Sequence, residues 1–218
     1  SGKDGLKFWM EFDHHKENVS VKILGKHHVY VLLPAIAVAI AAGIEFKKAV
    51  KAIENFQLPP GRMTMLEGIN GSLLIDSSYN ASPVAVKAAI DALQDFVGMR
   101  KIAVLGNMNE LGEYSEKLHR EVGEYLIGKV DQLITVGEWA RWIAAEAHKN
   151  GFMGEIYEAG DSMQAYDFLA GKIDKNDVIL FKGSQNKVRL EKLVKLLMAD
   201  PKKADELLSR QGIEWEKI

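Results

Sequence analysis

Residues 73–83 read Leu-Leu-Ile-Asp-Ser-Ser-Tyr-Asn-Ala-Ser-Pro, an apolar run followed by a polar turn and a helix start. Leu73–Asp76 predicts a buried strand, because short apolar runs bounded by turn residues are typical of parallel sheets. Ser82 followed by Pro83 is a favourable N-cap and first-turn pair, so a helix is predicted to begin there. Asp76 and Asn80 therefore fall in a strand-to-helix turn.

The same alternation continues towards the end of the chain. Further apolar runs predict strands at Ile102–Leu105, Gln132–Val136, Gly154–Tyr157 and Val178–Phe181. Amphipathic patterns predict helices at Pro83–Phe96, Ser115–Ile127, Glu138–Lys149, Ser162–Leu169 and Lys187–Met198. Residues 200–218 are predicted to add a short helix and carry Trp215. The pattern predicts an α/β fold, a Rossmann-like and mostly parallel sheet with helices on both faces.

The first part of the chain lacks this alternation. Its patterns predict two strands and then two helices, at Leu6–Phe12, Val19–Ile23, Val29–Gly43 and Phe46–Phe56. The polar His14–Asn18 segment is expected to join the strands. Leu58-Pro59-Pro60-Gly61 stops the helical pattern and predicts a hinge. We expect two domains: residues 1–58, the strand–helix tail of a truncated domain, and residues 59–218, the Rossmann-like domain.

The composition excludes several classes of protein. Hydrophobic residues make up 47% of the 218 residues, enough for a sizeable core. The net charge of −2 gives no footprint for nucleic acid and no polybasic membrane anchor. Without cysteine there are no disulfides, thiolate zinc sites or cysteine nucleophile, and a reducing cytosol fits. The apolar run Val29–Gly43 is shorter than the roughly 20 residues that span a bilayer. We expect a soluble, cytoplasmic monomer that does not insert into membranes.

Polar loops follow three of the predicted strands, and ligands of open parallel sheets bind beyond the C-terminal strand ends. These loops are Asp76–Pro83, Gly106–Gly112 and Lys182–Asn186. A lysine, a glycine and a hydroxyl at a helix start can hold a carboxylate or a phosphate. The residues favour an anion-binding domain. Each loop also has a purely structural interpretation, as a turn, a surface loop or a helix cap.

Several motifs follow one another in a distinctive order along the chain. They are Gly25–Val29, Ala35–Ala39, Pro60–Arg62, Leu74–Pro83, Ala103–Gly112, His119, Glu121–Gly123 and Phe181–Ser184. In this order they resemble the C-terminal portion of the Mur ligase family. The resemblance is greatest to the branch that adds D-alanyl-D-alanine to a UDP-N-acetylmuramoyl tripeptide.

The resemblance implies an ATP-dependent amide ligase of peptidoglycan synthesis. In this family ATP phosphorylates the carboxylate of the nucleotide-linked peptide, and the amine of the dipeptide then attacks the acyl phosphate. By position, the residues implied to bind ATP are Arg62, Asp76, Asn80 and His27. Those implied to bind the dipeptide are Asn107, Glu110, Lys182 and Ser184. The implied cofactors are ATP and Mg²⁺, with the magnesium ligands mainly upstream. The implied partners are the UDP-N-acetylmuramoyl peptide and D-alanyl-D-alanine, and no catalytic residue is assigned.

The chain also departs from the family pattern. It has no Gly-x-x-x-x-Gly-Lys-Ser/Thr phosphate loop, so we expect this chain alone to be inactive. Residues that differ from the usual ones are His28, Val31, Ser77, Asn107 and Gln185. Val31 cannot hydrogen-bond an adenine edge. Two alternatives stay open: another amide ligase of the superfamily, and a degenerate, non-catalytic ligand-binding domain.

Histidines and tryptophans receive structural interpretations. The pairs His14–His15 and His27–His28 are expected to hold no metal, because adjacent side chains in a strand point to opposite faces. His119 is interpreted as a solvated or capping histidine. Trp139 and Trp142 lie three residues apart on a predicted helix and are expected to pack against the sheet.

Overall fold

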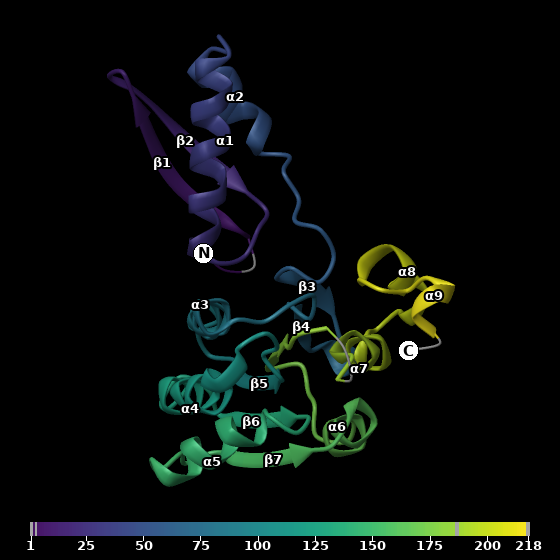
Figure 1. Cartoon of the computed structure of the whole chain (residues 1–218). Helices are drawn as coiled ribbons and strands as arrows, with labels where there is room; N and C mark the ends of the chain where they lie inside the picture. Colours follow the sequence, from purple (N-terminus) through teal and green to yellow (C-terminus); the bar gives the residue numbers. More distant parts are fainter. Residues whose placement is uncertain (1, 3, 186–187, 217–218) are drawn as a thin grey trace. The chain divides into compact units, whose positions relative to one another are not determined.

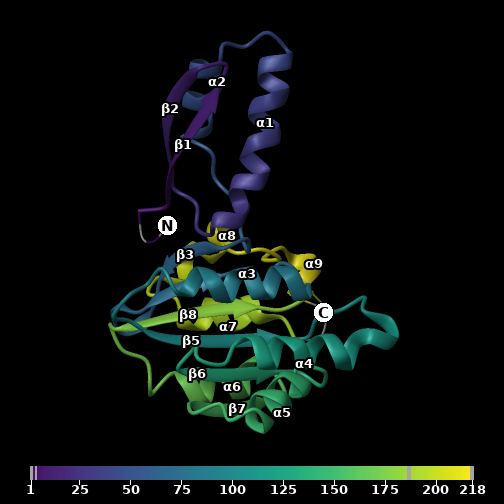
Figure 2. The same cartoon turned by 90° about the vertical axis from the view of Figure 1, so that its left-hand side faces the viewer.

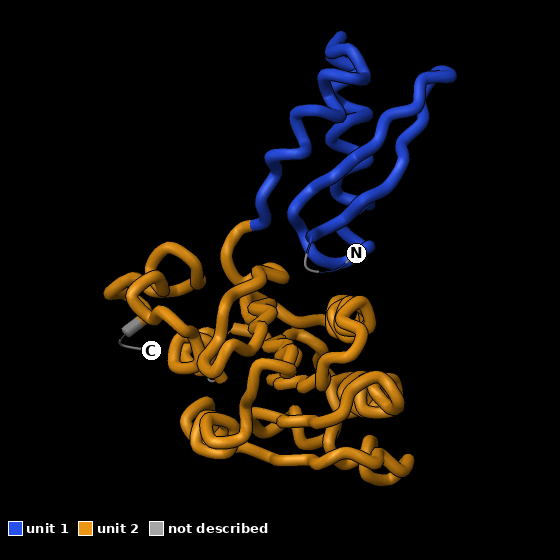
Figure 3. The backbone as a smooth tube through the Cα atoms, turned by 180° about the vertical axis from the view of Figure 1, so that it is seen from behind, with its two compact units in different colours: residues 1–58 blue, residues 59–218 orange. Residues whose placement is uncertain are grey.

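The chain divides into two compact units, Ser1–Leu58 and Pro59–Ile218 (Figure 3). The computed structural model describes residues 2, 4–185 and 188–216. Each unit has a core of its own, so each is described by itself. The division falls at the first of two consecutive prolines, where the helical pattern of the sequence stops.

Within its described residues, the second unit is built on a six-stranded sheet in the order β3-β4-β8-β5-β6-β7. The strands are β3 (Thr64–Glu67), β4 (Leu73–Asp76), β5 (Arg100–Gly106), β6 (Gln132–Val136), β7 (Glu155–Ala159) and β8 (Asp177–Lys182). All neighbouring strands pair in parallel except β3, which is antiparallel to β4. The mostly parallel sheet confirms the predicted fold class.

Helices cover both faces of this sheet (Figures 1 and 2). One face carries α3 (Pro83–Leu93), α4 (Ser115–Tyr125) and α5 (Arg141–Lys149), and the other carries α6 (Ser162–Leu169) and α7 (Leu190–Leu197). Shorter elements are η2 (Ile69–Gly71), η3 (Gly112–Tyr114), η4 (Pro201–Lys203), α8 (Ala204–Leu207) and α9 (Ile213–Glu216). The predicted helix Lys187–Met198 corresponds to α7, and Lys187 itself lies outside the described residues, as does Asn186 of the third polar loop.

The strand order places three loops side by side. The chain passes from β4 to β5, β6 and β7 along one face, and α6 then returns it across the other face to β8. Because β8 lies between β4 and β5, the carboxyl ends of these strands are neighbours. Such a reversal of strand order is where open α/β sheets bind ligands.

The first unit is a hairpin with two helices. Its elements are β1 (Leu6–Phe12), β2 (His15–Val21), η1 (Lys26–His28), α1 (Val29–Ala41) and α2 (Phe46–Ile53). The expected His14–Asn18 connection is wrong, because Phe12 pairs directly with His15. Asp13 and His14 have φ of 47° and 63°, the left-handed values that a two-residue hairpin turn requires.

Helix α1 buries one face and exposes an apolar one. Leu32 and Ile36 pack into the core of the first unit with strand residues such as Val19. Tyr30 and Val38 are 79% and 68% exposed. Pro34 lies inside α1 without ending it. Among the described residues, no helix is both long and apolar enough to cross a membrane.

Candidate functional site

The loop between β4 and α3, residues 77–82, is fixed at both ends. The Ser77 N–H donates to the Phe181 carbonyl (2.9 Å), which extends the pairing of β4 with β8 beyond the last residue of β4. At the other end, the Ser82 hydroxyl oxygen accepts the Ala85 N–H (3.4 Å), as its predicted N-cap role requires. The polar residues between these anchors are therefore presented at the carboxyl edge of the sheet.

Asp76 ends β4 with its carboxylate completely buried. Its Oδ1 accepts the Ser78 N–H (3.0 Å), whereas its Oδ2 has no hydrogen-bond partner among the described residues. Burial raises the pKa of Asp76 to about 6, and the hydrogen bond from the Ser78 N–H opposes this only in part. A buried acceptor without a partner indicates a place that a ligand or water completes.

Lys182, at the end of β8, extends beneath the same loop. Its ammonium donates to the Ser77 hydroxyl (3.1 Å) and to the Asn80 carbonyl (3.0 Å), and the residue is 5% exposed. Burial lowers the pKa of Lys182 to about 8; Arg62 adds to this and Asp76 opposes it. In this structure Lys182 therefore braces the loop from below.

Arg62 and Asn80 are exposed polar residues of this edge. The Arg62 guanidinium lies over the Tyr79 ring, 4.3 Å from its centroid. The Tyr79 N–H donates to the Gly61 carbonyl (3.1 Å), which ties the ring to the backbone that carries the arginine. The Asn80 Oδ1 accepts the Ala81 N–H (2.9 Å). An exposed arginine held by an aromatic ring suits the recognition of a polyanion.

The loop after β5 is fixed by His119 of α4, which is completely buried. The Met108 N–H donates to His119 Nε2 (2.9 Å), and His119 Nδ1 lies 2.7 Å from the Ser115 carbonyl. Because a carbonyl only accepts, this geometry assigns the proton of a neutral ring to Nδ1. The solvated or capping interpretation of His119 is wrong, because its ring supplies the buried acceptor that the Met108 N–H requires.

Ser184 joins the two loops. Its hydroxyl donates to the Ala81 carbonyl (3.2 Å) and accepts the Asn109 N–H (3.0 Å). Its own N–H donates to the Asn107 carbonyl (2.8 Å). The structure thus brings together Asp76, Asn80, Lys182 and Ser184 with Asn107 of the second loop.

A cavity of about 430 Å³ lies where β5, β6 and β7 end. Its lining residues are Asn107, Asn109, Gly137, Glu138, Trp139, Gly160 and Val188. The Asn107 Oδ1 accepts the N–H groups of Trp139 (2.9 Å) and Ala140 (3.0 Å), which caps the start of α5. Glu110 belongs to the same loop as Asn107 and is exposed, with a φ of 63°.

The two tryptophans are placed differently from each other. The expectation that Trp139 packs against the sheet is wrong, because α5 begins only at Arg141. Trp139 therefore lies in the turn before this helix and is 41% exposed at the cavity. Trp142 is half-buried, with the Arg120 guanidinium 4.4 Å from its ring centroid.

His119→Leu is expected to lower the free energy of unfolding at pH 7 by about 1–3 kcal/mol, because it leaves the Met108 N–H buried without an acceptor. Burial lowers the pKa of His119 below its ordinary 6.5. The unfolded chain therefore takes up this proton first, and the stability contributed by the neutral ring is lost as the pH falls below about 6.5. Urea denaturation should show the difference between wild type and variant shrinking between pH 7 and pH 5.

His148 supplies the matched control for this measurement, since it is an exposed histidine on α5. His148→Leu removes an imidazole without touching the loop after β5. If His119→Leu had the same free energy of unfolding as the wild type at pH 7, the hydrogen bonds of the His119 ring would not hold this loop.

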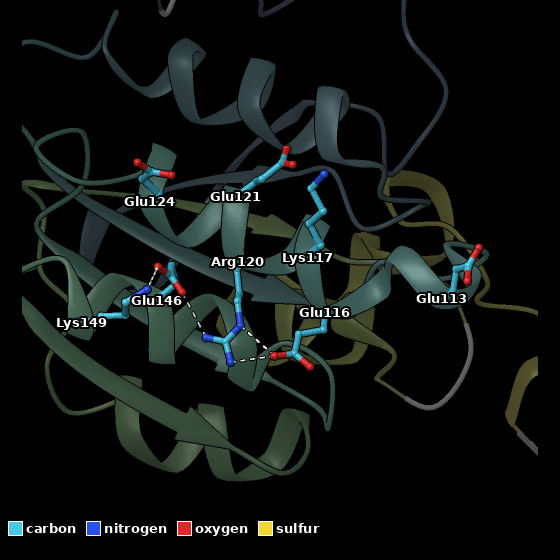
Figure 4. Close-up of a pocket in the computed structure, with 8 residues that line it drawn as sticks. All are labelled: Glu113, Glu116, Lys117, Arg120, Glu121, Glu124, Glu146 and Lys149. Carbon is cyan, nitrogen blue, oxygen red and sulfur yellow. Dashed lines mark hydrogen bonds and ion pairs between the residues drawn. The ribbon is translucent and has the colours of Figure 1, made fainter.

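A second hollow, about 520 Å³, runs along α4 and α5 (Figure 4). Its lining residues are charged: Glu113, Glu116, Lys117, Arg120, Glu121, Glu124, Glu146 and Lys149. Arg120 pairs with Glu116 (2.8 Å) and Glu146 (3.1 Å), and Lys149 also pairs with Glu146 (2.9 Å). Several of these charges pair with one another on a helical flank away from the three polar loops, so this hollow is not part of the candidate site.

His27 belongs to the first unit, where its ring lies 4.1 Å from that of His28. Both residues are in η1 or at its end, so the expectation that they occupy a strand with opposed side chains is wrong. His28 is buried, and its Nδ1 lies 2.7 Å from the Leu24 carbonyl. No group of three or more potential metal ligands occurs in the part of the chain that the structure describes.

Sequence reasoning misses the roles of two residues at this edge. Ser77 stands out in the sequence only as a departure from a pattern, yet its hydroxyl receives Lys182. Arg210 does not stand out at all, although it donates to the Ser78 carbonyl (3.3 Å). No local signal could have revealed Arg210, because its partners lie far away in the sequence.

Comparisons with known proteins agree on one family. A family model described as "Mur ligase, glutamate ligase domain" matches residues 61–185. The UDP-N-acetylmuramoyl-tripeptide--D-alanyl-D-alanine ligase of Bacillus subtilis (strain 168) is 32% identical over 183 residues, which are 83% of this chain and 40% of that protein. The chain spans about 40% of the length of such curated relatives.

Solved structures show the same similarity. MurF from Acinetobacter baumannii superposes with a TM-score of 0.79 at 27% identity, covering 91% of this chain and 43% of that one. MurF ligase from Thermotoga maritima in complex with ADP superposes with a TM-score of 0.73 at 26% identity, covering 93% of this chain and 47% of that one.

Proposed function

This chain belongs to the Mur ligase family, and from that membership we propose that it is the C-terminal part of an ATP-dependent amide ligase of peptidoglycan synthesis. The complete ligase would join D-alanyl-D-alanine to a UDP-N-acetylmuramoyl peptide through an acyl phosphate. The observation that carries this proposal is the meeting of three polar loops, after β4, β5 and β8, at one edge of the sheet.

The loop after β4 is proposed to receive ATP. Arg62 is exposed and oriented by Tyr79, so its guanidinium can bind phosphate oxygens. Asn80 lies beside it with an exposed side chain. The unpartnered Oδ2 of Asp76 fits a ligand hydroxyl that reaches it when the loop moves. The adenosine-binding role of His27 and the placing of the magnesium ligands elsewhere in the ligase belong to the same proposal.

The cavity of about 430 Å³ is proposed to receive the dipeptide. Asn109 and Glu138 line it with polar atoms, and Trp139 offers an apolar ring. Glu110, exposed on the loop beside it, can bind an ammonium group. Lys182 and Ser184 support this site from beneath, because they hold the loops after β4 and β5 against each other.

The first unit is proposed to be the end of the ligase's central, ATP-binding domain. The support is the apolar exposed face of α1, which includes Tyr30, Val31, Leu33 and Val38. A face of this kind on a helix is ordinarily covered by other elements of the same domain.

Phosphate release tests the proposed function. With ATP, Mg²⁺, a UDP-N-acetylmuramoyl tripeptide and D-alanyl-D-alanine, the complete ligase is expected to release phosphate only when both substrates are present. The present chain alone is expected to release none, because its sequence contains no phosphate loop. Release with a different amine would make the protein a sister ligase, and no release with any amine would favour a non-catalytic binding domain.

A further inference from the structure

The C-terminal segment of the second unit, residues 209–216, contacts the loop after β4 through Arg210. The Arg210 guanidinium donates to the backbone carbonyls of Ser78 (3.3 Å) and Tyr79. Its side chain is only 4% exposed. A buried guanidinium that donates to two consecutive carbonyls constrains the loop backbone directly.

A buried carboxylate holds Arg210 in this position. Glu191 of α7 is completely buried and pairs with Arg210 (3.4 Å) and with Arg189. Arg189 in turn donates to the Trp215 carbonyl (2.8 Å) and the Arg210 carbonyl (3.5 Å). Buried ion networks contribute little net stability, so their value lies more in fixing positions.

Arg210 also contacts the aromatic ring that orients Arg62. The Tyr79 ring has the Arg210 guanidinium 5.2 Å from its centroid and the Arg62 guanidinium 4.3 Å away. Other hydrogen bonds hold the two ends of the loop, whereas among the described residues the donor to the Ser78 and Tyr79 carbonyls is Arg210. The contacts of Arg210 therefore act on the part of the loop that carries the Tyr79 ring.

We propose that Arg210 is a positioning residue, which fixes the Ser78–Tyr79 backbone and, through the Tyr79 ring, the guanidinium of Arg62. The inference rests on the proposed role of Arg62 towards the ATP phosphates. It assigns to the C-terminal segment a supporting function in nucleotide binding, through the loop after β4.

Hydrogen exchange on this chain tests the positioning itself, without any need for activity. In Arg210→Met the Ser77 and Tyr79 amides, both hydrogen-bonded in the wild type, should exchange about tenfold faster or more. The Val122 amide, in the interior of α4, should keep its wild-type rate. Arg210→Lys keeps a positive charge beside Glu191, so it serves as a second variant if Arg210→Met does not fold. Its Ser77 and Tyr79 amides should exchange at rates between those of the wild type and of Arg210→Met.

Arg120 provides the matched control, because it is likewise held by carboxylates and lies over an aromatic ring, but on α4. Arg120→Met should leave the Ser77 and Tyr79 amides unchanged. Wild-type exchange at these amides in both Arg210 variants would overturn the proposal.

Kinetics of the complete ligase test the consequence. Arg210→Lys should raise the KM for ATP by about tenfold, the order expected for a lost hydrogen bond, with the KM for the dipeptide unchanged. Arg120→Met should leave both the KM for ATP and the KM for the dipeptide unchanged. An active ligase whose Arg210 variants keep the wild-type KM for ATP would overturn the inference. A wild-type ligase without substrate-dependent phosphate release would instead refute the proposed function, and the exchange data would still decide whether Arg210 positions the loop.

Discussion

Asp76→Asn is expected to raise the free energy of unfolding of this chain at pH 7 by up to about 3 kcal/mol, since each pKa unit corresponds to about 1.4 kcal/mol. Burial raises the pKa of Asp76 from 3.8 to about 6, so the folded chain holds this proton more tightly than the unfolded chain. Ionisation therefore subtracts stability as the pH rises from about 3.8 to about 6. Urea denaturation should show the full difference in free energy of unfolding between Asp76→Asn and wild type above pH 6, and no difference below pH 4.

The same substitution is expected to impair the complete ligase. Substrate-dependent phosphate release should fall by about 10- to 100-fold, because a charge-assisted hydrogen bond of about 1.5–3 kcal/mol would be lost. Opposite effects on stability and activity are typical of a group that destabilises the unliganded protein but contributes to the binding of its ligand.

Asp177 is the matched control for Asp76, because it is equally buried but paired. Its two carboxylate oxygens accept from the Arg100 guanidinium, at 2.8 Å each. Asp177→Asn should therefore destabilise the chain at pH 7, by about 1.5–3 kcal/mol. A similar loss in Asp76→Asn would show that the Asp76 carboxylate is already satisfied, and its proposed role would be wrong.

The inner strands of the parallel sheet could be predicted because they are buried on both faces. An unbroken apolar run such as that of β8, all of whose residues are buried, leaves a signal in the sequence itself. Strand β3 could not be predicted in this way. It has four residues, follows Met63 with a φ of 59°, and forms because β4 offers an edge to pair with.

The sequence could predict which loops form the candidate site, but it could not predict where their side chains point. A loop's place follows from the strand it ends, whereas the direction of a side chain depends on distant neighbours. Lys182 illustrates this, because its partners Ser77 and Asn80 lie more than one hundred residues away. Sequence reasoning misses Arg210 and interprets His119 wrongly for the same reason. The burial and the partners of a side chain depend on the tertiary structure.

Gly123→Ala is expected to lower the free energy of unfolding by up to about 2 kcal/mol. A Cβ at Gly123 of α4 would lie 2.3 Å from the Ile143 carbonyl oxygen of α5 and 3.0 Å from Glu146 Cβ. The obstacle is backbone, so α4 and α5 must move apart, at a typical overpacking cost of about 1–3 kcal/mol. The higher helix propensity of alanine, worth about 1 kcal/mol, offsets only part of this. Urea denaturation at pH 7 measures the net effect.

Gly171→Ala serves as the control, because no atom lies within 4 Å of the added Cβ. It should leave stability within experimental error. Helices α4 and α5, which pack closely at Gly123, also hold the loop after β5. His119 on α4 accepts the Met108 N–H, and Asn107 caps the start of α5. Separating α4 from α5 should therefore also raise the KM of the complete ligase for the dipeptide. A stable Gly123→Ala chain with wild-type kinetics would mean that α4 and α5 tolerate separation, and that the loop after β5 does not depend on their close packing.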